Sequence, residues 1–158
     1  MKSNHLFIAL VGLLGFSACN NNDQLFQLVS PEKSGIDFTN TITVNDTINI
    51  LESEFTYNGG GVAVGDLNGD GLQDIYFAGN QVQNKLYLNK GELKFEEVIE
   101  KAGAQKTKGQ WSSGVTFVDI NSDGKQDIYV CNTMIEDSAA LRDLLFINQG
   151  NNAEGVPQ

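Results

Sequence analysis

The sequence predicts an all-β fold assembled from two copies of a four-stranded antiparallel repeat. The main observation is internal similarity: residues 61–77 read GVAVGDLNGDGLQDIYF and residues 114–130 read GVTFVDINSDGKQDIYV, with ten of seventeen positions identical at an offset of 53. The similarity resumes between residues 84–91 and 143–150. In addition, 17 glycines against two prolines indicate many tight turns. These features favour short strands joined by turns.

Short β-branched and aromatic runs flank an acidic turn in each copy. They lie at residues 62–64 and 75–77 in the first copy and at 115–117 and 128–130 in the second, and further runs follow at 85–88 and 94–98. Four short strands in about fifty residues is the size of one β-propeller blade. Closing a propeller takes about four blades or more. We therefore expect an incomplete propeller of about two blades, from the N-terminal part of a longer protein.

The N-terminus has the pattern of an export signal. Lys2 precedes an apolar run over residues 6–16, which leads into Ser17, Ala18 and Cys19. A run of about eleven residues is too short to span a bilayer and is typical of a signal-peptide core. Small residues before a cysteine resemble a bacterial lipoprotein signal, in which Cys19 is lipidated. The alternative is an ordinary secretory signal with an incidental cysteine. The first interpretation predicts an outer-membrane lipoprotein of the cell envelope, periplasmic or surface-facing, anchored to the membrane through Cys19.

These patterns divide the chain into four parts. We expect a lipoprotein signal peptide at 1–19, a polar tether with an N-terminal strand segment at 20–56, a first repeat at 57–109 and a truncated second repeat at 110–158. The strand segment is suggested by alternating stretches at 36–38 and 41–44.

The acidic turn of each copy has the spacing of a calcium loop. Oxygen-bearing side chains fall at positions 1, 3, 5 and 9, with glycine at position 6. Calcium takes six to eight oxygen ligands in a flexible shell, and the glycine permits the reversal that turns the carbonyl of position 7 inward. The predicted structural calcium sites, about two in number, are Asp66, Asn68, Asp70, the carbonyl of Leu72 and Asp74 in the first loop, and Asp119, Asn121, Asp123, the carbonyl of Lys125 and Asp127 in the second.

Two alternatives bear on this assignment. An EF-hand needs a glutamate at position 12, where these loops have Phe77 and Val130, so that motif is excluded. Clusters of Asp, Asn and Gly also form turns without any metal. Two loops in register, each with three carboxylates that repel one another, favour the calcium interpretation.

The two loops and their flanking strands resemble FG-GAP/VCBS repeats, the blades of integrin-α-like propellers. The wider context, YNGGGVAVGD through NKLYLNKG and GVTFVDI through LLFINQG, is similar to cartilage-acidic-protein-like, ASPIC/UnbV-associated lipoproteins of Bacteroidetes. The resemblance covers about residues 24–150. It implies a non-catalytic cell-envelope binding or scaffold protein whose partner is a glycan or an extracellular protein.

Charge and histidine content narrow the function further. The formal net charge of −10 argues against nucleic-acid binding, which relies on Lys and Arg meeting phosphate. The one histidine, His5, lies in the predicted signal peptide, so the rest of the chain lacks the commonest general base. We therefore expect no enzymatic activity; the alternative is an accessory N-terminal part of a larger secreted hydrolase. Tyr57, Asn58 and Trp111 precede the first strand of their copies and are candidates for ligand contact.

Overall fold

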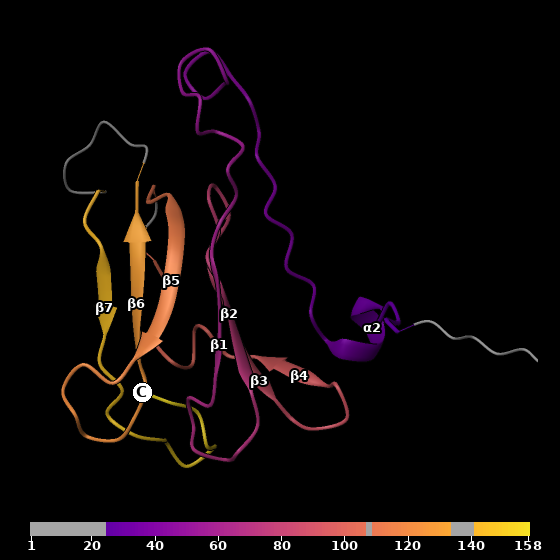
Figure 1. Ribbon diagram of the computed structural model, residues 1–158, viewed down its shortest axis with the longest axis vertical. Helices are drawn as coiled ribbons and strands as arrows, with labels where there is room; N and C mark the ends of the chain where they lie inside the picture. Colours follow the sequence, from indigo (N-terminus) through magenta and orange to yellow (C-terminus); the bar gives the residue numbers. More distant parts are fainter. Residues whose placement is uncertain (1–24, 107–108, 134–140) are drawn as a thin grey trace, which may run out of the picture.

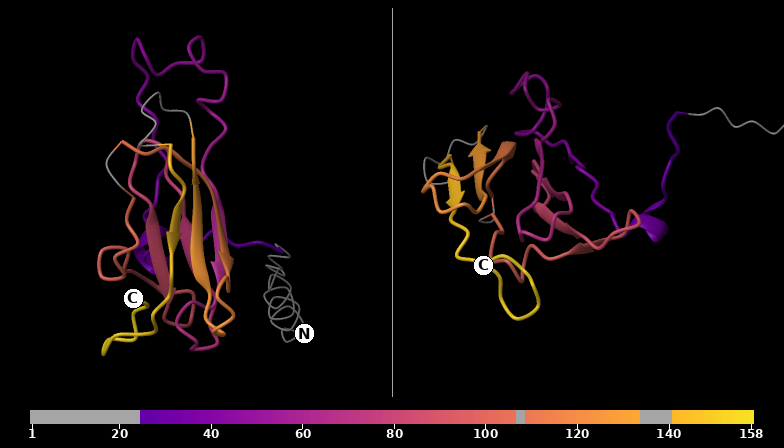
Figure 2. Two further views of the ribbon diagram at one scale, coloured as in Figure 1. Left: turned by 90° about the vertical axis from the view of Figure 1, so that its left-hand side faces the viewer. Right: turned by 60° about the horizontal axis from the view of Figure 1, so that its bottom comes forward.

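The computed structural model describes residues 25–106, 109–133 and 141–158. Nearly all of its regular structure is β: a four-stranded and a three-stranded antiparallel sheet stand side by side (Figures 1 and 2). The predicted signal peptide, the lipidation site Cys19 and the start of the tether lie outside the described residues. Along the described part of the chain, no helix has the length and apolar character needed to cross a membrane.

Sheet A is formed by the first repeat and has the strand order β1-β2-β3-β4. Its strands are β1 (Val62–Gly65), β2 (Asp74–Phe77), β3 (Lys85–Asn89) and β4 (Phe95–Glu97). Sheet B is formed by the second repeat and has the order β5-β6-β7. Its strands are β5 (Ser112–Val118), β6 (Asp127–Asn132) and β7 (Leu144–Phe146). The predicted blade organisation is confirmed, with four strands in one sheet and three in the other.

Each acidic turn joins the first two strands of its sheet. Gly65 pairs with Asp74 at the end of the β1–β2 ladder, and Val118 pairs with Asp127 at the end of the β5–β6 ladder. The turns therefore lie at residues 66–73 and 119–126, together at the same end of the molecule (Figure 1). The repeated sequence thus gives a repeated strand–turn–strand unit.

The two sheets share one hydrophobic core. Leu86 and Leu88 of β3 are fully buried and belong to the same cluster as Ile128 and Val130 of β6. Tyr76 is also fully buried, and its hydroxyl donates a hydrogen bond to the Ala104 carbonyl (3.0 Å) and accepts one from Asn84 Nδ2 (3.0 Å). Burial raises the pKa of Tyr76 above its ordinary value. The apolar faces of the alternating strands therefore meet between the repeats.

The segment before the first repeat does not form the strand expected there. Between residues 25 and 61 the structure has only one short helix, α2 (Pro31–Ser34). The chain then crosses sheet A through side-chain contacts: Phe38 stacks on Phe77 with ring centroids 4.9 Å apart, and Tyr87 Oη donates to Asp37 (2.6 Å). Because these contacts involve side chains, the stretches at 36–38 and 41–44 lie against sheet A but form no backbone hydrogen-bond ladder with it.

Residues 32–35 share a short turn sequence with residues 100–103 that the sequence analysis missed. They read EKSG, and residues 100–103, just after β4, read EKAG. Both glycines adopt left-handed backbone, with φ 78° at Gly35 and 66° at Gly103. In both, the glycine N–H closes a turn, at 2.7 Å from the Pro31 carbonyl and 3.2 Å from the Glu100 carbonyl. The likeness is short and includes one conservative change, which is why it escapes a search based on the acidic loops.

A buried lysine fixes the loop that follows β2. Lys106 is 6% exposed, and its ammonium donates hydrogen bonds to the carbonyls of Gly79 and Asn80, at 2.7 Å in the second case. Within the described residues it forms no ion pair with a carboxylate. Burial lowers its pKa to about 8.

This burial predicts a stability that increases at alkaline pH. Since the pKa of Lys106 is lower in the folded state than in the unfolded state, the unfolded chain binds more protons above pH 8, and stability rises with pH until the ordinary lysine pKa is reached. Urea unfolding at pH 7 and pH 9 should show a gain of about 1 kcal/mol for the wild type relative to Lys106→Met. Equal pH dependence in the two proteins would contradict the assignment.

Candidate functional site: the paired acidic loops

The first acidic loop is organised around the carboxylate of Asp66. Its Oδ1 accepts hydrogen bonds from the backbone N–H groups of Gly69 (2.8 Å) and Asp70 (3.1 Å), and its Oδ2 accepts one from Gly71 (2.8 Å). Asn68 donates through Nδ2 to Asp70 Oδ2 (3.0 Å), while its Oδ1 accepts from the Asp70 N–H (3.1 Å). This is the bonding expected where Asp and Asn fold a tight turn around their own backbone.

The second loop repeats most of this arrangement. Asp119 accepts from the N–H groups of Asp123 (3.1 Å) and Gly124 (2.9 Å). Asn121 Nδ2 donates to Asp123 Oδ2 (3.1 Å), and its Oδ1 accepts from the Asp123 N–H (3.0 Å). At position 7, the N–H groups of Leu72 and Lys125 donate to the carboxylates two residues before them, at 2.8 and 2.9 Å. The side chains at positions 1, 3 and 5 therefore bond within each turn, and the residue at position 7 joins them through its N–H group.

The carboxylate at position 9 has a different role. Asp74 is fully buried; its Oδ2 accepts from the Leu67 N–H (2.9 Å) and its Oδ1 from the Asn89 N–H (2.9 Å). Asp127, also fully buried, makes the equivalent bonds to the N–H groups of Ile120 (3.1 Å) and Asn148 (2.8 Å). Each of these side chains connects its loop to the strand or turn beyond it. Position 9 therefore supports the fold directly.

Burial and like charge act together on Asp74. Desolvation is the main effect that raises the pKa of this carboxyl, and the negative charges of Asp70 and Asp66 raise it further, against the two backbone hydrogen bonds, which lower it. A cation near the three groups would relieve this repulsion. The donor set, made up only of oxygen atoms, is the type that calcium prefers.

The geometry is not that of a preformed metal centre. Among the residues that the structure describes, no group of three or more His, Cys, Asp or Glu side chains is arranged to hold a metal ion. The carboxylates of Asp66 and Asp119 accept hydrogen bonds from backbone N–H groups of their own turns, and those of Asp74 and Asp127 accept from the N–H groups of Leu67 and Ile120. The oxygen ligands fit calcium. To bind them, a cation would have to compete with the backbone N–H groups that the carboxylates now contact.

The two loops differ at position 7. Lys125 places its ammonium 2.9 Å from Asp123 Oδ2, which lowers the pKa of that carboxyl, whereas the first loop has Leu72 at this position. This ion pair is exposed, so its net stabilisation is small. It nevertheless supplies the second loop with a positive charge that the first loop lacks.

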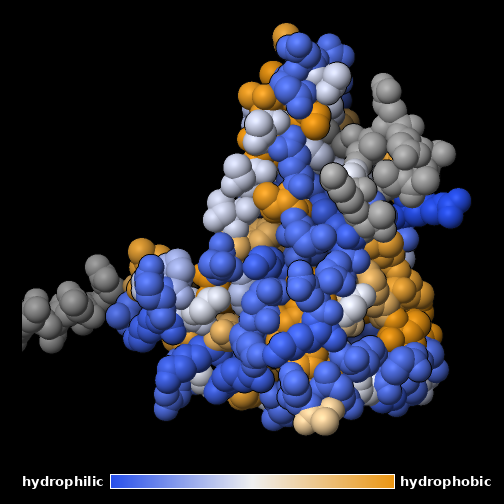
Figure 3. Space-filling model, turned by 180° about the vertical axis from the view of Figure 1, so that it is seen from behind, coloured by the Kyte–Doolittle hydropathy of each residue, from blue (hydrophilic) through white to orange (hydrophobic). Residues whose placement is uncertain are grey.

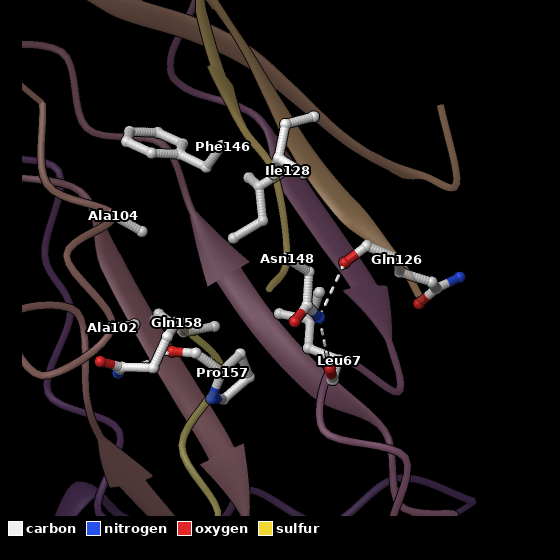
Figure 4. Close-up of a pocket in the computed structure, with 11 residues that line it drawn as sticks. Leu67, Ala102, Ala104, Gln126, Ile128, Phe146, Asn148, Pro157 and Gln158 are labelled. Atoms are coloured by element: carbon white, nitrogen blue, oxygen red, sulfur yellow. Dashed lines mark hydrogen bonds between the residues drawn. The ribbon is translucent and has the colours of Figure 1, made fainter. Parts of the chain in front are cut away.

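Two asparagines that the sequence analysis did not select hold the loops in place. Asn148 Nδ2 donates to the Leu67 carbonyl of the first loop (2.9 Å) and to the Gln126 carbonyl of the second (3.2 Å), so one side chain joins both loops (Figure 4). Its counterpart Asn89 donates to the Gln73 carbonyl (3.0 Å). The signal was present in the sequence, because both residues belong to a repeated Asn-x-Gly after the third strand.

The residues expected to contact a ligand lie at the other end of the sheets. Tyr57 is 59% exposed and Asn58 is exposed, whereas Trp111 is only 5% exposed. Trp111 directly precedes β5, and with Asn80, beyond β2, it lines a cavity that neither Tyr57 nor Asn58 reaches. The structure therefore separates the three candidates.

Comparison with known proteins agrees with the repeat seen here. A model of the FG-GAP-like repeat matches residues 66–130, which begin at the first acidic loop and run through the second loop to Val130 in β6. No curated protein matches the chain. Across residues 66–130, this chain contains an FG-GAP-like repeat.

Proposed function

We propose that this protein is a non-catalytic, calcium-stabilised binding or scaffold module of the cell envelope. The observation that supports this most directly is the pair of acidic loops, whose hydrogen bonds recur from one repeat to the next. Equivalent loops at the same end of two packed sheets suit a structural ion in each repeat better than a single reaction centre. Lipidation at Cys19 would hold the module at the outer membrane, with its sheets presenting loops to a glycan or protein partner.

The residues that would hold calcium are those at positions 1, 3, 5 and 9 of each loop, with the carbonyl at position 7. A bound ion would supply positive charge where Asp66, Asp70 and Asp74 now repel one another. Its effect is to stabilise the turn between the first two strands of a blade, so ion binding and folding are coupled.

Calcium is expected to raise the melting temperature, and removing it with a chelator should reverse the change. The matched variant is Asp70→Asn with Asp123→Asn, because asparagine keeps an oxygen that accepts the N–H of position 7 while removing one charge from each loop. We expect this double variant to lose most of the calcium-dependent increase while folding normally without calcium. The measurements are differential scanning calorimetry and calcium titration calorimetry, with magnesium as the competing ion.

Glu54→Gln is the control, since it removes one negative charge from an exposed position far from the loops. It should respond to calcium as the wild type does. A wild-type protein that gives no heat with calcium and melts at the same temperature in chelator would contradict the proposal.

A further inference from the structure

The cavity lined by Trp111 and Asn80 lies at the end of the molecule opposite the acidic loops. It has a volume of about 810 Å³ and lies between the segment 46–56 and the residues that follow β2 and precede β5. Figure 1 shows this segment rising beyond the upper ends of the sheets, while both acidic turns lie at the lower ends. Seen from behind, the segment projects from the body with hydrophilic and hydrophobic residues mixed on its surface (Figure 3). The volume is within the usual range of small-ligand sites, roughly 300–1,000 Å³.

The floor of this cavity is fixed by buried polar contacts. Asn80 is 1% exposed; its Nδ2 donates to the carbonyls of Gly59 (3.2 Å) and Ser112 (3.0 Å), and its Oδ1 accepts from Asn40 Nδ2 (2.6 Å). The ammonium of Lys106 donates to the Asn80 carbonyl from below. A floor held from several directions does not need to reorganise when a ligand enters.

The wall formed by segment 46–56 is also preorganised. The hydroxyl of Thr56, a fully buried residue, donates to the carbonyls of Asn49 (3.1 Å) and Ser53 (2.7 Å). Asn45 Oδ1 accepts from the N–H groups of Thr47 (2.9 Å) and Ile48 (2.8 Å). These bonds satisfy the backbone of the segment and leave the carboxylates of Asp46 and Glu52 exposed, in no ion pair with any described residue.

The lining chemistry selects a class of ligand. Its surface is mixed: hydroxyl, amide and carboxylate groups lie beside a larger apolar area, to which Ile48 and the small exposed part of Trp111 contribute. Among the residues that the structure describes, the lining includes no Lys or Arg, and its two carboxylates would repel an anion. A strongly apolar ligand would leave these polar groups without partners. Sugars match such a lining, because they carry many hydroxyl donors and acceptors together with apolar C–H faces that pack on apolar side chains.

We propose that this cavity binds an uncharged oligosaccharide, with Asp46 and Glu52 accepting hydrogen bonds from sugar hydroxyls and the apolar part of the lining, Ile48 included, packing against the sugar C–H groups. The inference rests on the proposed binding function and specifies its ligand. Because the calcium loops lie at the other end of the sheets, they stabilise the site without touching the sugar.

The chain itself supplies the probe, since Trp111 is its one tryptophan. The test is tryptophan emission during titration of the full chain, in calcium, with neutral hexasaccharides of glucose, mannose and xylose, and with the anionic hexasaccharide of galacturonic acid. We expect a saturable change with at least one neutral sugar and none with the anionic one. Asp46→Ala and Glu52→Ala should each weaken binding by about tenfold, the loss of one hydrogen bond to a charged group. Glu54→Ala, on the same segment but outside the lining, should bind as the wild type does.

Three results would overturn this site: no saturable change with any neutral hexasaccharide in fluorescence and calorimetry, equal binding of the anionic sugar, or sugar binding unaffected by both lining variants. The last result would place sugar binding elsewhere on the protein and leave the proposed binding function standing. Calcium stabilisation is measured by melting temperature and is independent of all three outcomes.

Discussion

Replacing Asp74 with alanine is expected to destabilise the protein by roughly 2–5 kcal/mol in the absence of calcium, because one buried and one partly buried backbone donor lose their acceptor. Both oxygens of this carboxylate are used, one by the Leu67 N–H and one by the Asn89 N–H, and the side chain is fully buried. Water cannot replace the lost acceptor without opening the first sheet. Urea unfolding in chelator measures the effect, and Asp127→Ala should lose a similar amount through its bonds to Ile120 and Asn148.

The raised pKa of Asp74 predicts that the stability of the protein depends on pH, and it fixes the direction of that dependence. Because burial raises the pKa of Asp74 in the folded state, the folded protein binds its proton more tightly than the unfolded chain does. Stability in chelator should therefore fall as pH rises above the ordinary aspartate pKa of 3.8, and it should fall less in Asp74→Asn. Glu54→Ala, at an exposed position, should change stability by less than about 0.5 kcal/mol. If Asp74→Ala were as stable as this control, the structural role of position 9 would be wrong.

Replacing Gly61 with alanine is expected to cost about 1–3 kcal/mol or more, because the two sheets approach each other backbone to backbone at this residue. A Cβ at Gly61 would lie 2.8 Å from Gly114 Cα and 2.8 Å from the Val115 nitrogen, both in β5. Neither atom can move without displacing a strand of sheet B. Thermal unfolding should show a single transition at a clearly lower temperature.

Gly114 provides the matched control, because it occupies the same position of the second repeat. A Cβ there would meet only the side chain of Cys131, at 3.6 Å, which is ordinary van der Waals contact. Gly114→Ala should therefore change stability by less than about 1 kcal/mol. Equal losses at the two glycines would mean that the sheets do not pack as closely as the structure indicates.

Local sequence patterns predicted the strands and turns well, since each depends on neighbours along the chain. The alternation of apolar and polar residues at 62–64 and 75–77 is satisfied within one hairpin, β1–β2. The Asp, Asn and Gly residues of the loop form hydrogen bonds mainly within that loop. The alternating stretches at 36–38 and 41–44 form no strand in the described chain, because a strand also needs a partner. Side chains of this segment instead bond to Asn80 and Tyr87, and the Thr43 backbone N–H donates to Gln81 Oε1.

The acidic loops show how much the sequence determined by itself: the two repeats, their strands and the loop residues follow from the spacing of residues that interact locally. The tertiary structure decided which of those residues serve the fold. Asp74 and Asp127 resemble the other loop carboxylates in sequence, yet only packing against the following turns buries them. In the same way, Gly61 and Gly114 occupy the same position in the two repeats but have different environments. Gly61 faces the backbone of sheet B, whereas Gly114 faces the side chain of Cys131. Repeated sequence gives each copy the same local conformation. The tertiary contacts of a copy differ, because they depend on the neighbours against which that copy packs.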